Sequence, residues 1–122
     1  PYKLELSNDG KRLAIFVVHP TGRPSHRIQL CEVNWSTADG PALKTVGEPI
    51  PAFHGAMSHD GMWLAKREEG QPSGQLLDLS SSPPKVVMDL GSLNHCQFSP
   101  DGRWLAVNRG EIVIWAKGDS VW

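Results

Sequence analysis

Short runs in which apolar and polar residues alternate recur along this chain of 122 residues, and turn-forming residues separate them. Alternation with a period of two is typical of a β-strand with one buried face. Residues 4–6 and 96–98 are clear examples, and each is followed by a polar turn and a longer apolar run. The pattern predicts almost no helix. It predicts strands at residues 4–6, 13–18, 27–33, 43–46, 75–79, 85–90, 96–98, 104–107 and 111–115.

A longer repeat is superimposed on this pattern, because the phrase Ser-x-Asp-Gly-x-x-Leu-Ala occurs three times. The copies occupy residues 7–14, 58–65 and 99–106, so their aspartates are 51 and then 41 residues apart. Ser, Asp, Gly, Leu and Ala all keep fixed offsets, which chance explains poorly. A period of about 40 to 50 residues is typical of a propeller blade or a solenoid unit.

Within each copy, Asp-Gly stands between two apolar runs, which is a strong hairpin signal. Glycine supplies the positive φ that such a turn needs, and the Ser or Asp side chain can accept a hydrogen bond from a nearby backbone N–H. A calcium loop would need several oxygen ligands in one short segment. We therefore assign a structural role in turns to Asp9, Gly10, Asp60, Gly61, Asp101 and Gly102.

The predicted strands group into repeats of four short antiparallel strands, which is the blade of a β-propeller. The fold class is therefore all-β, with three blades in a single partial β-propeller domain. Blade one covers residues 1–48, blade two residues 49–91 and blade three residues 92–122. Closed propellers typically have four to eight blades, so three blades are expected to form part of a ring, half of it if the ring has six.

Blade three resembles the WD-repeat β-propellers most clearly, through residues 96–107 followed by 112–115. The resemblance extends to the other two repeats, with departures. Trp115 is followed by Ala116 where the family often has Asp, and His54-Gly55 reverses the Gly-His pair that often opens a repeat. The resemblance implies a propeller that serves as a protein-interaction scaffold. Related WD-like propellers with Ser-Pro-Asp-Gly turns include periplasmic Tol-type proteins and the gating domains of peptidases.

Composition narrows the function classes. The net charge is −1 and the basic residues form no stripe, which argues against nucleic-acid binding. No stretch reaches the ~18 apolar residues of a membrane span. Cys31 and Cys96 lie in different blades and are expected to be free, buried thiols, and no zinc spacing is present. We expect no cofactor or metal and a cytoplasmic location, with the periplasm as the alternative.

The candidate binding surface is the face formed by the loops between second and third strands and by the links between blades. Functional residues often lie on such loops, held by a rigid scaffold. The partner-binding residues predicted there are His19, Arg23, His26, Glu68, Glu69, Gln71, Arg109 and Glu111. Residues 47–51 and 91–94 are expected on the same face. The alternative is that these segments are only solvated connections.

Lys3, His54 and His95 occupy equivalent positions, four residues before the turn serine of their repeats. Such positions lie near the channel of a propeller and could bind a small anion or a metal. The alternative is that their equivalence only reflects duplication of the repeat.

Both ends of the predicted blade stack would be apolar and uncovered. Tyr2, Leu4 and Leu6 lie in the first strand, and no polar cap is evident. Repeat units bury their faces only against neighbours. We therefore expect further blades to cover these faces, from the same chain or from another copy in a homo-oligomer.

Two functions remain open at this point. The first is a non-catalytic module that binds a protein or peptide. The second is a regulatory or substrate-gating propeller segment of a larger enzyme, such as a peptidase or kinase, or a Tol-type propeller. We expect the chain itself not to be an enzyme, because no motif such as Gly-x-Ser-x-Gly orders a nucleophile and its base.

Overall fold

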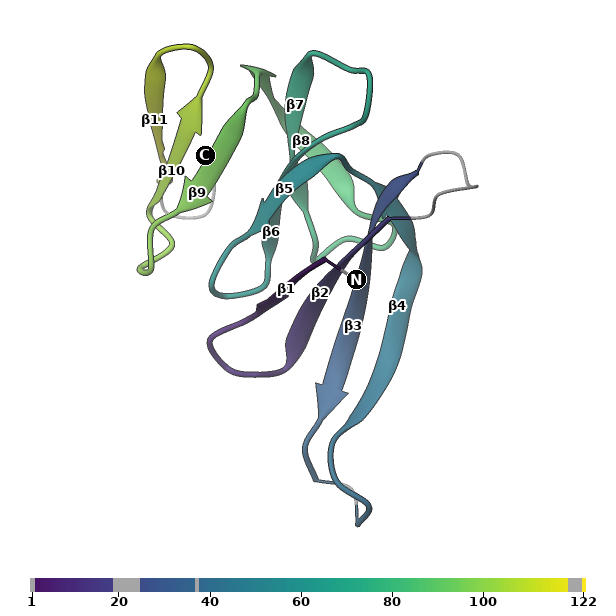
Figure 1. The fold of residues 1–122 in the computed structure, drawn as a ribbon. Coiled ribbons are helices and arrows are strands. Elements are labelled where there is room, and N and C mark those ends of the chain that lie inside the picture. The colour runs from purple at the N-terminus through teal and green to yellow at the C-terminus, as the bar shows by residue number, and fades with distance from the viewer. Residues whose placement is uncertain (1, 19–24, 37, 119–121) are drawn as a thin grey trace.

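The structure is a computed structural model, and it describes residues 2–18, 25–36, 38–118 and 122. The described residues form three antiparallel sheets, with strand orders β1-β2-β3-β4, β5-β6-β7-β8 and β11-β10-β9. Figure 1 shows the first and third sheets on opposite sides of the second. The strands are β1 (Lys3–Leu6), β2 (Arg12–Val18), β3 (His26–Asn34), β4 (Ala42–Pro51), β5 (His54–Met57), β6 (Trp63–Arg67), β7 (Ser73–Asp78), β8 (Lys85–Ser92), β9 (His95–Phe98), β10 (Trp104–Asn108) and β11 (Ile112–Ala116).

Each sheet is a propeller-like blade, and the expectation of an all-β fold with three consecutive blades is confirmed. Within the described residues the third blade has three strands, and no strand lies on the outer edge of β11. A fourth strand of this blade was expected toward the end of the sequence, and residues 119–121 there lie outside the described residues. The first strands of neighbouring blades lie side by side: Lys3 Nζ donates to the Gly55 carbonyl at 3.0 Å, and the Met57 N–H donates to Glu5 Oε2 at 2.6 Å.

The three Ser-x-Asp-Gly phrases form the same turn, as predicted. In the third copy, Ser99 donates its hydroxyl to Asp101 Oδ1, and Ser99 Oγ accepts from the Trp104 N–H at 3.0 Å. Asp101 Oδ1 also accepts from the Arg103 N–H at 3.0 Å. The same three bonds occur in the turns of Asp9 and Asp60. The turn glycines have φ values of 72°, 76° and 75° at positions 10, 61 and 102, respectively.

The pattern of buried residues along a strand shows which faces of its blade pack against a neighbouring blade. In β2 the residues Ala14 and Phe16 are buried while their neighbours are only half-buried, so one face of blade one is covered. In β6 of the middle blade, Leu64, Ala65 and Lys66 are all buried, because blades lie against both faces. Leu64 belongs to the core between blades one and two, and Ala65 to the core between blades two and three.

The outward faces of the two end blades are apolar and exposed. On blade one, Leu4 and Leu6 are 61% and 49% exposed. On blade three, Trp104, Ile112 and Ile114 are 48%, 66% and 62% exposed. The strand register places these three side chains on one face of the β10–β11 pair. The expected open faces are therefore present in the described chain.

β4 differs most from its expected range. In blade two, β5 and β6 have no counterpart among the strands predicted from alternation, and β8 continues to Ser92 rather than ending at residue 90. β4 was predicted at residues 43–46, with residues 47–51 as a connection, but it continues to Pro51. A register shift between the pairs of Ile28 and Leu30 interrupts the ladder, and Gly47 there has a φ of 68°. Pairing resumes at Ile28 with Ile50. Gly47 and Pro49 therefore lie in an irregular stretch inside β4 rather than in a connection between strands. The strand continues beyond this stretch, and Ile50 is buried in the core.

Candidate binding face and channel mouth

One end of the blades carries the β2–β3, β4–β5, β6–β7 and β8–β9 connections, and we call it the connection face. The strand register defines it: Lys3 pairs with Phe16, His54 with Arg67, and His95 with Asn108. The starts of the first strands therefore lie beside the ends of the second strands. The predicted partner-binding residues that are described all come from this end, whereas His19 and Arg23 lie outside the described residues.

Two of the predicted residues meet across the junction of blades one and two. His26 Nδ1 lies 3.6 Å from Glu69 Oε2, and the Ser25 hydroxyl donates a short hydrogen bond to the same oxygen. The bond from Ser25, with the charge of His26, holds the pKa of Glu69 below its ordinary value. Glu69 therefore stays ionised, and it remains exposed on the surface.

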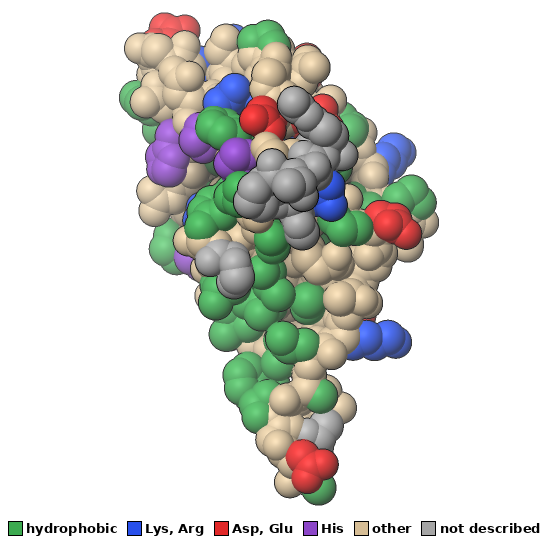
Figure 2. Space-filling view, turned by 45° about the vertical axis from the view of Figure 1, so that its right-hand side comes forward, with side chains coloured by type: hydrophobic (Ala, Val, Ile, Leu, Met, Phe, Trp, Pro, Cys, Tyr) green, Lys and Arg blue, Asp and Glu red, His purple; other side chains and the backbone are tan. Residues whose placement is uncertain are grey.

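An aromatic and cationic cluster that was not predicted from the sequence lies beside this pair. The Phe53 ring is 4.7 Å from the His26 ring and 4.5 Å from the His54 ring, between ring centroids. The Arg67 guanidinium lies over the Phe53 ring at 5.3 Å, and Arg67 Nη1 donates to the Gln71 carbonyl at 3.1 Å. Arg67 Nε is buried and has no hydrogen-bond partner among the described residues. Figure 2 shows histidine side chains gathered near the upper left of the molecule, beside hydrophobic ones.

The other predicted residues are more dispersed. Glu68 Oε1 lies 3.4 Å from Lys66 Nζ, within blade two. In blade three, the Arg109 N–H donates to the Glu111 carbonyl at 2.8 Å. The Arg109 guanidinium lies beside Gly91, where a Cβ atom would come within 2.7 Å of it. The structure therefore brings His26, Glu69 and Gln71 near one cluster, while Arg109 and Glu111 form a separate turn.

The channel mouth is the place on the connection face where the first strands begin. A cavity of about 100 Å³ lies here, and its lining includes Lys3, His54 and His95 together with Tyr2, Phe16, Phe53, Gly55 and Cys96. All three repeat-equivalent positions therefore meet at one cavity. Burial raises the pKa of the Cys96 thiol to about 12, so this group is a protonated thiol at neutral pH.

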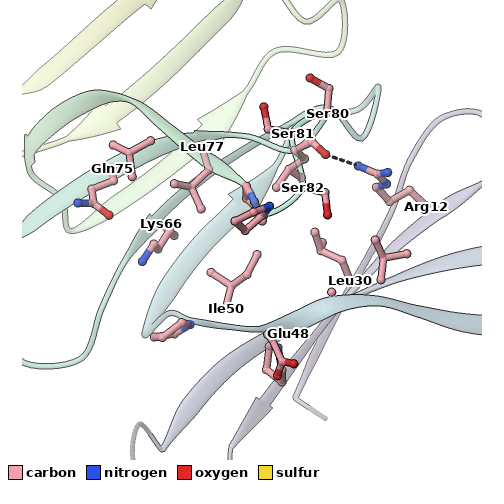
Figure 3. A pocket seen from close by; sticks show the side chains of 18 residues that line it. Arg12, Leu30, Glu48, Ile50, Lys66, Gln75, Leu77, Ser80, Ser81 and Ser82 are labelled. Carbon is pink, nitrogen blue, oxygen red and sulfur yellow. Dashed lines mark hydrogen bonds between the residues drawn. The ribbon is translucent and has the colours of Figure 1, made fainter.

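A larger groove, of about 590 Å³, runs between the outer parts of blades one and two (Figure 3). Its floor is apolar and includes Leu30, Ile50 and Leu77. In Figure 3, Lys66 and Arg12 stand at opposite ends of it, and Arg12 Nη1 donates to the Leu79 carbonyl at 3.3 Å. Residues 47–51, expected on the connection face, line this groove instead.

Two further observations concern the described residues. They contain no cluster of three or more His, Cys, Asp or Glu side chains placed to hold a metal ion. Within the same ranges, none of the elements is a helix of sufficient length and apolarity to cross a membrane. Cys31 and Cys96 are both free and buried, as expected.

No protein-family model matches the chain, and no curated protein matches it in sequence. Solved structures do match it. The β-propeller domain of Myceliophteria thermophila Cps50 (Swd1) has a TM-score of 0.69 at 18% identity, over 95% of this chain and 40% of that one. Kuenenia stuttgartiensis hydrazine synthase has a TM-score of 0.55 at 13% identity, over 95% and 45% of the two chains.

A third similar structure is a functionally unknown protein from Desulfotomaculum acetoxidans DSM 771, with a TM-score of 0.55 at 13% identity, over 94% of this chain and 51% of that one. The chain thus spans between 40% and 51% of the length of the three structures. At such low identities the likeness shows the fold alone: three antiparallel sheets that form part of a β-propeller.

Proposed function

We propose that this chain is a non-catalytic, WD-repeat-like propeller module that binds a protein or peptide on its connection face. The observation that carries the proposal is the cluster of Phe53, His26, Arg67 and Glu69 at the junction of blades one and two. It combines an aromatic ring, a guanidinium group and an ionised carboxylate within one small area. Aromatic and arginine side chains are enriched where proteins bind one another.

The cluster is also held in place by the fold, which favours recognition. The Phe53 N–H donates to the Arg67 carbonyl at 2.6 Å, and the Ala52 N–H donates to the His26 carbonyl at 3.1 Å. The side chains therefore project from paired strand ends, and little conformational entropy is lost when a partner binds. Arg67 Nε adds a donor without an acceptor, so a small local shift would let it bind an oxygen of the partner.

Capture of partners on the immobilised chain tests this proposal. Bound proteins are identified by mass spectrometry and their affinities measured with purified partner. We expect Glu69→Lys and Gln71→Lys each to weaken binding by roughly tenfold or more, as is common at the centre of an interface. Asp39→Lys makes the same charge change as Glu69→Lys, on the exposed β3–β4 loop at the opposite end, and it should bind as the wild type does. Equal affinities for all four proteins would remove the connection face as the site.

The open apolar faces support a second kind of partner, a further propeller blade. The outward face of blade one carries Leu13, which is equivalent to Leu64 on the face of blade two that packs against blade one. The outward face of blade three carries Ala106, equivalent to Ala65 on the face of blade two that packs against blade three. Each open face is thus complementary to the other, so a second copy can cover both in a head-to-tail arrangement.

The alternative function is a regulatory or gating segment attached to an enzyme. No contact among the described residues favours it over the interaction module. The flanking sequence of the gene discriminates the two, because a peptidase or kinase domain in the same chain would favour the alternative.

A further inference from the structure

Three cationic or titratable side chains converge where the first strands of the blades begin. Lys3 opens β1, His54 opens β5 and His95 opens β9. They line the same cavity of about 100 Å³ at the channel mouth. This volume is about three times the ~30 Å³ that one water molecule occupies in the liquid, so it can hold a group the size of a carboxylate or a phosphate.

The walls and the donors of this cavity suit a small oxyanion. Phe16 and Phe53 make its walls apolar, which lowers the local dielectric constant and strengthens charge interactions. The polar groups at its lining are the Lys3 ammonium, two imidazoles and the Tyr2 hydroxyl, and all of these can donate hydrogen bonds. Lys3 Nζ donates to the Gly55 carbonyl at 3.0 Å and lies 3.1 Å from Glu5 Oε1, so one of the three ammonium donors is left for an anion. The Tyr2 hydroxyl donates to the Phe53 carbonyl at 3.4 Å and would have to turn toward the anion.

The charges around the cavity are mostly positive. Four groups lower the pKa of His54 by their charge: Arg67 on β6, His95 on β9, Lys3 on β1 and His26 on β3. The nearby carboxylates are already paired: Glu5 Oε1 lies 3.1 Å from Lys3 Nζ, and Glu69 Oε2 lies 3.6 Å from His26 Nδ1.

The electrostatic consequence is visible at His54. Burial first, and then these four charges, hold the pKa of His54 below its ordinary value of 6.5. Protonation of His54 is thus unfavourable, because burial and the neighbouring positive groups oppose it. The same groups disfavour a metal cation and favour an anion.

We propose that the cavity binds one oxyanion group, a carboxylate or a phosphate, between Lys3, His54 and His95. This deepens the proposed function and rests on it in one respect: an acidic side chain or terminal carboxylate of the bound peptide is one source of the group. Free phosphate is the other source, and the experiment separates the two.

Binding of the anion is linked to protonation. An anion favours the imidazolium form, so it raises the pKa of His54 when it binds. By the same linkage, protonation of His54 strengthens binding, and the affinity rises as the pH falls through the pKa of His54. This coupling gives the proposal a readout at a single residue.

Histidine ring signals followed by NMR over a pH series test the proposal. The probes are inorganic phosphate, a short acetylated peptide that contains Glu, and the same peptide with Gln, all at ionic strength matched with NaCl. We expect phosphate, the Glu peptide or both to raise the pKa of His54 in a saturable way, and the Gln peptide to leave it unchanged. His59, in the turn of Asp60 at the opposite end of β5, is the internal control and should not respond.

Two variants locate the site. His95→Gln, at an exposed position, and Lys3→Gln should each weaken the binding of the anion by roughly tenfold or more, as expected for the loss of a hydrogen bond to a charged group. His95→Gln keeps the test informative if Lys3→Gln disturbs the packing of β1.

The outcomes separate the two proposals. Saturation by phosphate alone assigns the site to a free anion, and saturation by the Glu peptide assigns it to an acidic partner segment. An unchanged pKa of His54 with both anions, or an equal response at His59, would overturn the anion site. Partner capture that still depends on Glu69 would then leave the proposed function intact.

Discussion

At the residue scale, the Ser-x-Asp-Gly turns show how one set of hydrogen bonds is used three times with different surroundings. The serine and aspartate bonds are the same in each copy, but the glycines differ in their neighbours. A Cβ atom at Gly61 would lie 3.1 Å from the Ser7 Cβ, whereas no atom lies within 4 Å of one at Gly102. Gly61 is thus restricted by blade one as well as by its φ, and Gly102 by its φ alone.

Replacing Gly102 by Val should destabilise the chain by about 1–3 kcal/mol, because a β-branched residue is strained at a φ of 75°. Urea denaturation followed by tryptophan fluorescence measures the loss. Gly102→Asn is the matched variant and should lose less, since Asn tolerates positive φ better than Val does. Equal stability of Gly102→Val and the wild type would mean that the turn does not need glycine.

The lowered pKa of His54 predicts a pH dependence of stability. The unfolded chain binds a proton to this histidine more readily than the folded chain, so protonation favours unfolding. The stabilisation is complete above the ordinary pKa of 6.5 and is lost as the pH falls below it. We expect His54→Gln to reduce the acid-induced loss of stability between about pH 7 and about pH 5, with His59→Gln as the control. An identical pH profile for His54→Gln and the wild type would contradict this prediction.

At the scale of the element, equivalent strands have different roles because their blades have different neighbours. Leu13, Leu64 and Leu105 occupy the same position in β2, β6 and β10. Leu64 and Leu105 are 0% exposed, since each packs against the preceding blade. Leu13 is only half-buried, because no blade among the described residues packs against its face. The same sequence phrase thus forms core in two blades and surface in one.

We therefore expect Leu64→Ala to destabilise the chain by about 2–5 kcal/mol, and Leu13→Ala by clearly less. The first substitution leaves a cavity between blades one and two, and the second shortens a side chain on an open face. Urea midpoints at low protein concentration provide the comparison. Equal losses for the two variants would show that another surface covers Leu13 in solution.

At the scale of the whole molecule, the two open faces leave several large apolar side chains exposed. A large apolar side chain gains about 1.5–3 kcal/mol when it is buried, and a small domain is stable by only about 5–15 kcal/mol. Leu4, Leu6, Trp104, Ile112 and Ile114 are all largely exposed. Exposed apolar faces of this kind favour association, as the proposed contact between copies requires.

We predict that the isolated chain associates through these faces, with a dimer of six blades as the expected form. Light scattering at micromolar concentration should give a mass above the 13.4 kDa of one chain. Ile114→Asp should weaken association, because the charge would be buried at the junction, whereas Val87→Asp on the outer strand β8 should not. A wild-type monomer whose sharp unfolding is independent of concentration would contradict the prediction.

Most of the strands and all three Ser-x-Asp-Gly turns could be predicted in order, because the signals for them are local. Alternation predicts the exposed and buried faces of a strand, and Asp-Gly predicts a turn, so the strands expected in blades one and three and the turn φ values agree with the predictions. In blade two, β5 and β6 were not among the strands predicted from alternation. The length of β4 was missed, since Gly47 and Pro49 read locally as a connection while the burial of Ile50 extends the strand.

Which residues meet between blades depends on how the sheets pack against one another in three dimensions. His26 and Glu69 are each recognisable as polar loop residues, but their contact depends on how blade two stacks on blade one. Phe53 and Arg67 carry no functional signal in the sequence, because a single ring or guanidinium there is compatible with ordinary packing. The spacing of the repeats sets equivalent positions, whereas the rotation from one blade to the next sets the distances between them. That rotation comes from side-chain packing over the whole interface, which no short stretch of sequence encodes.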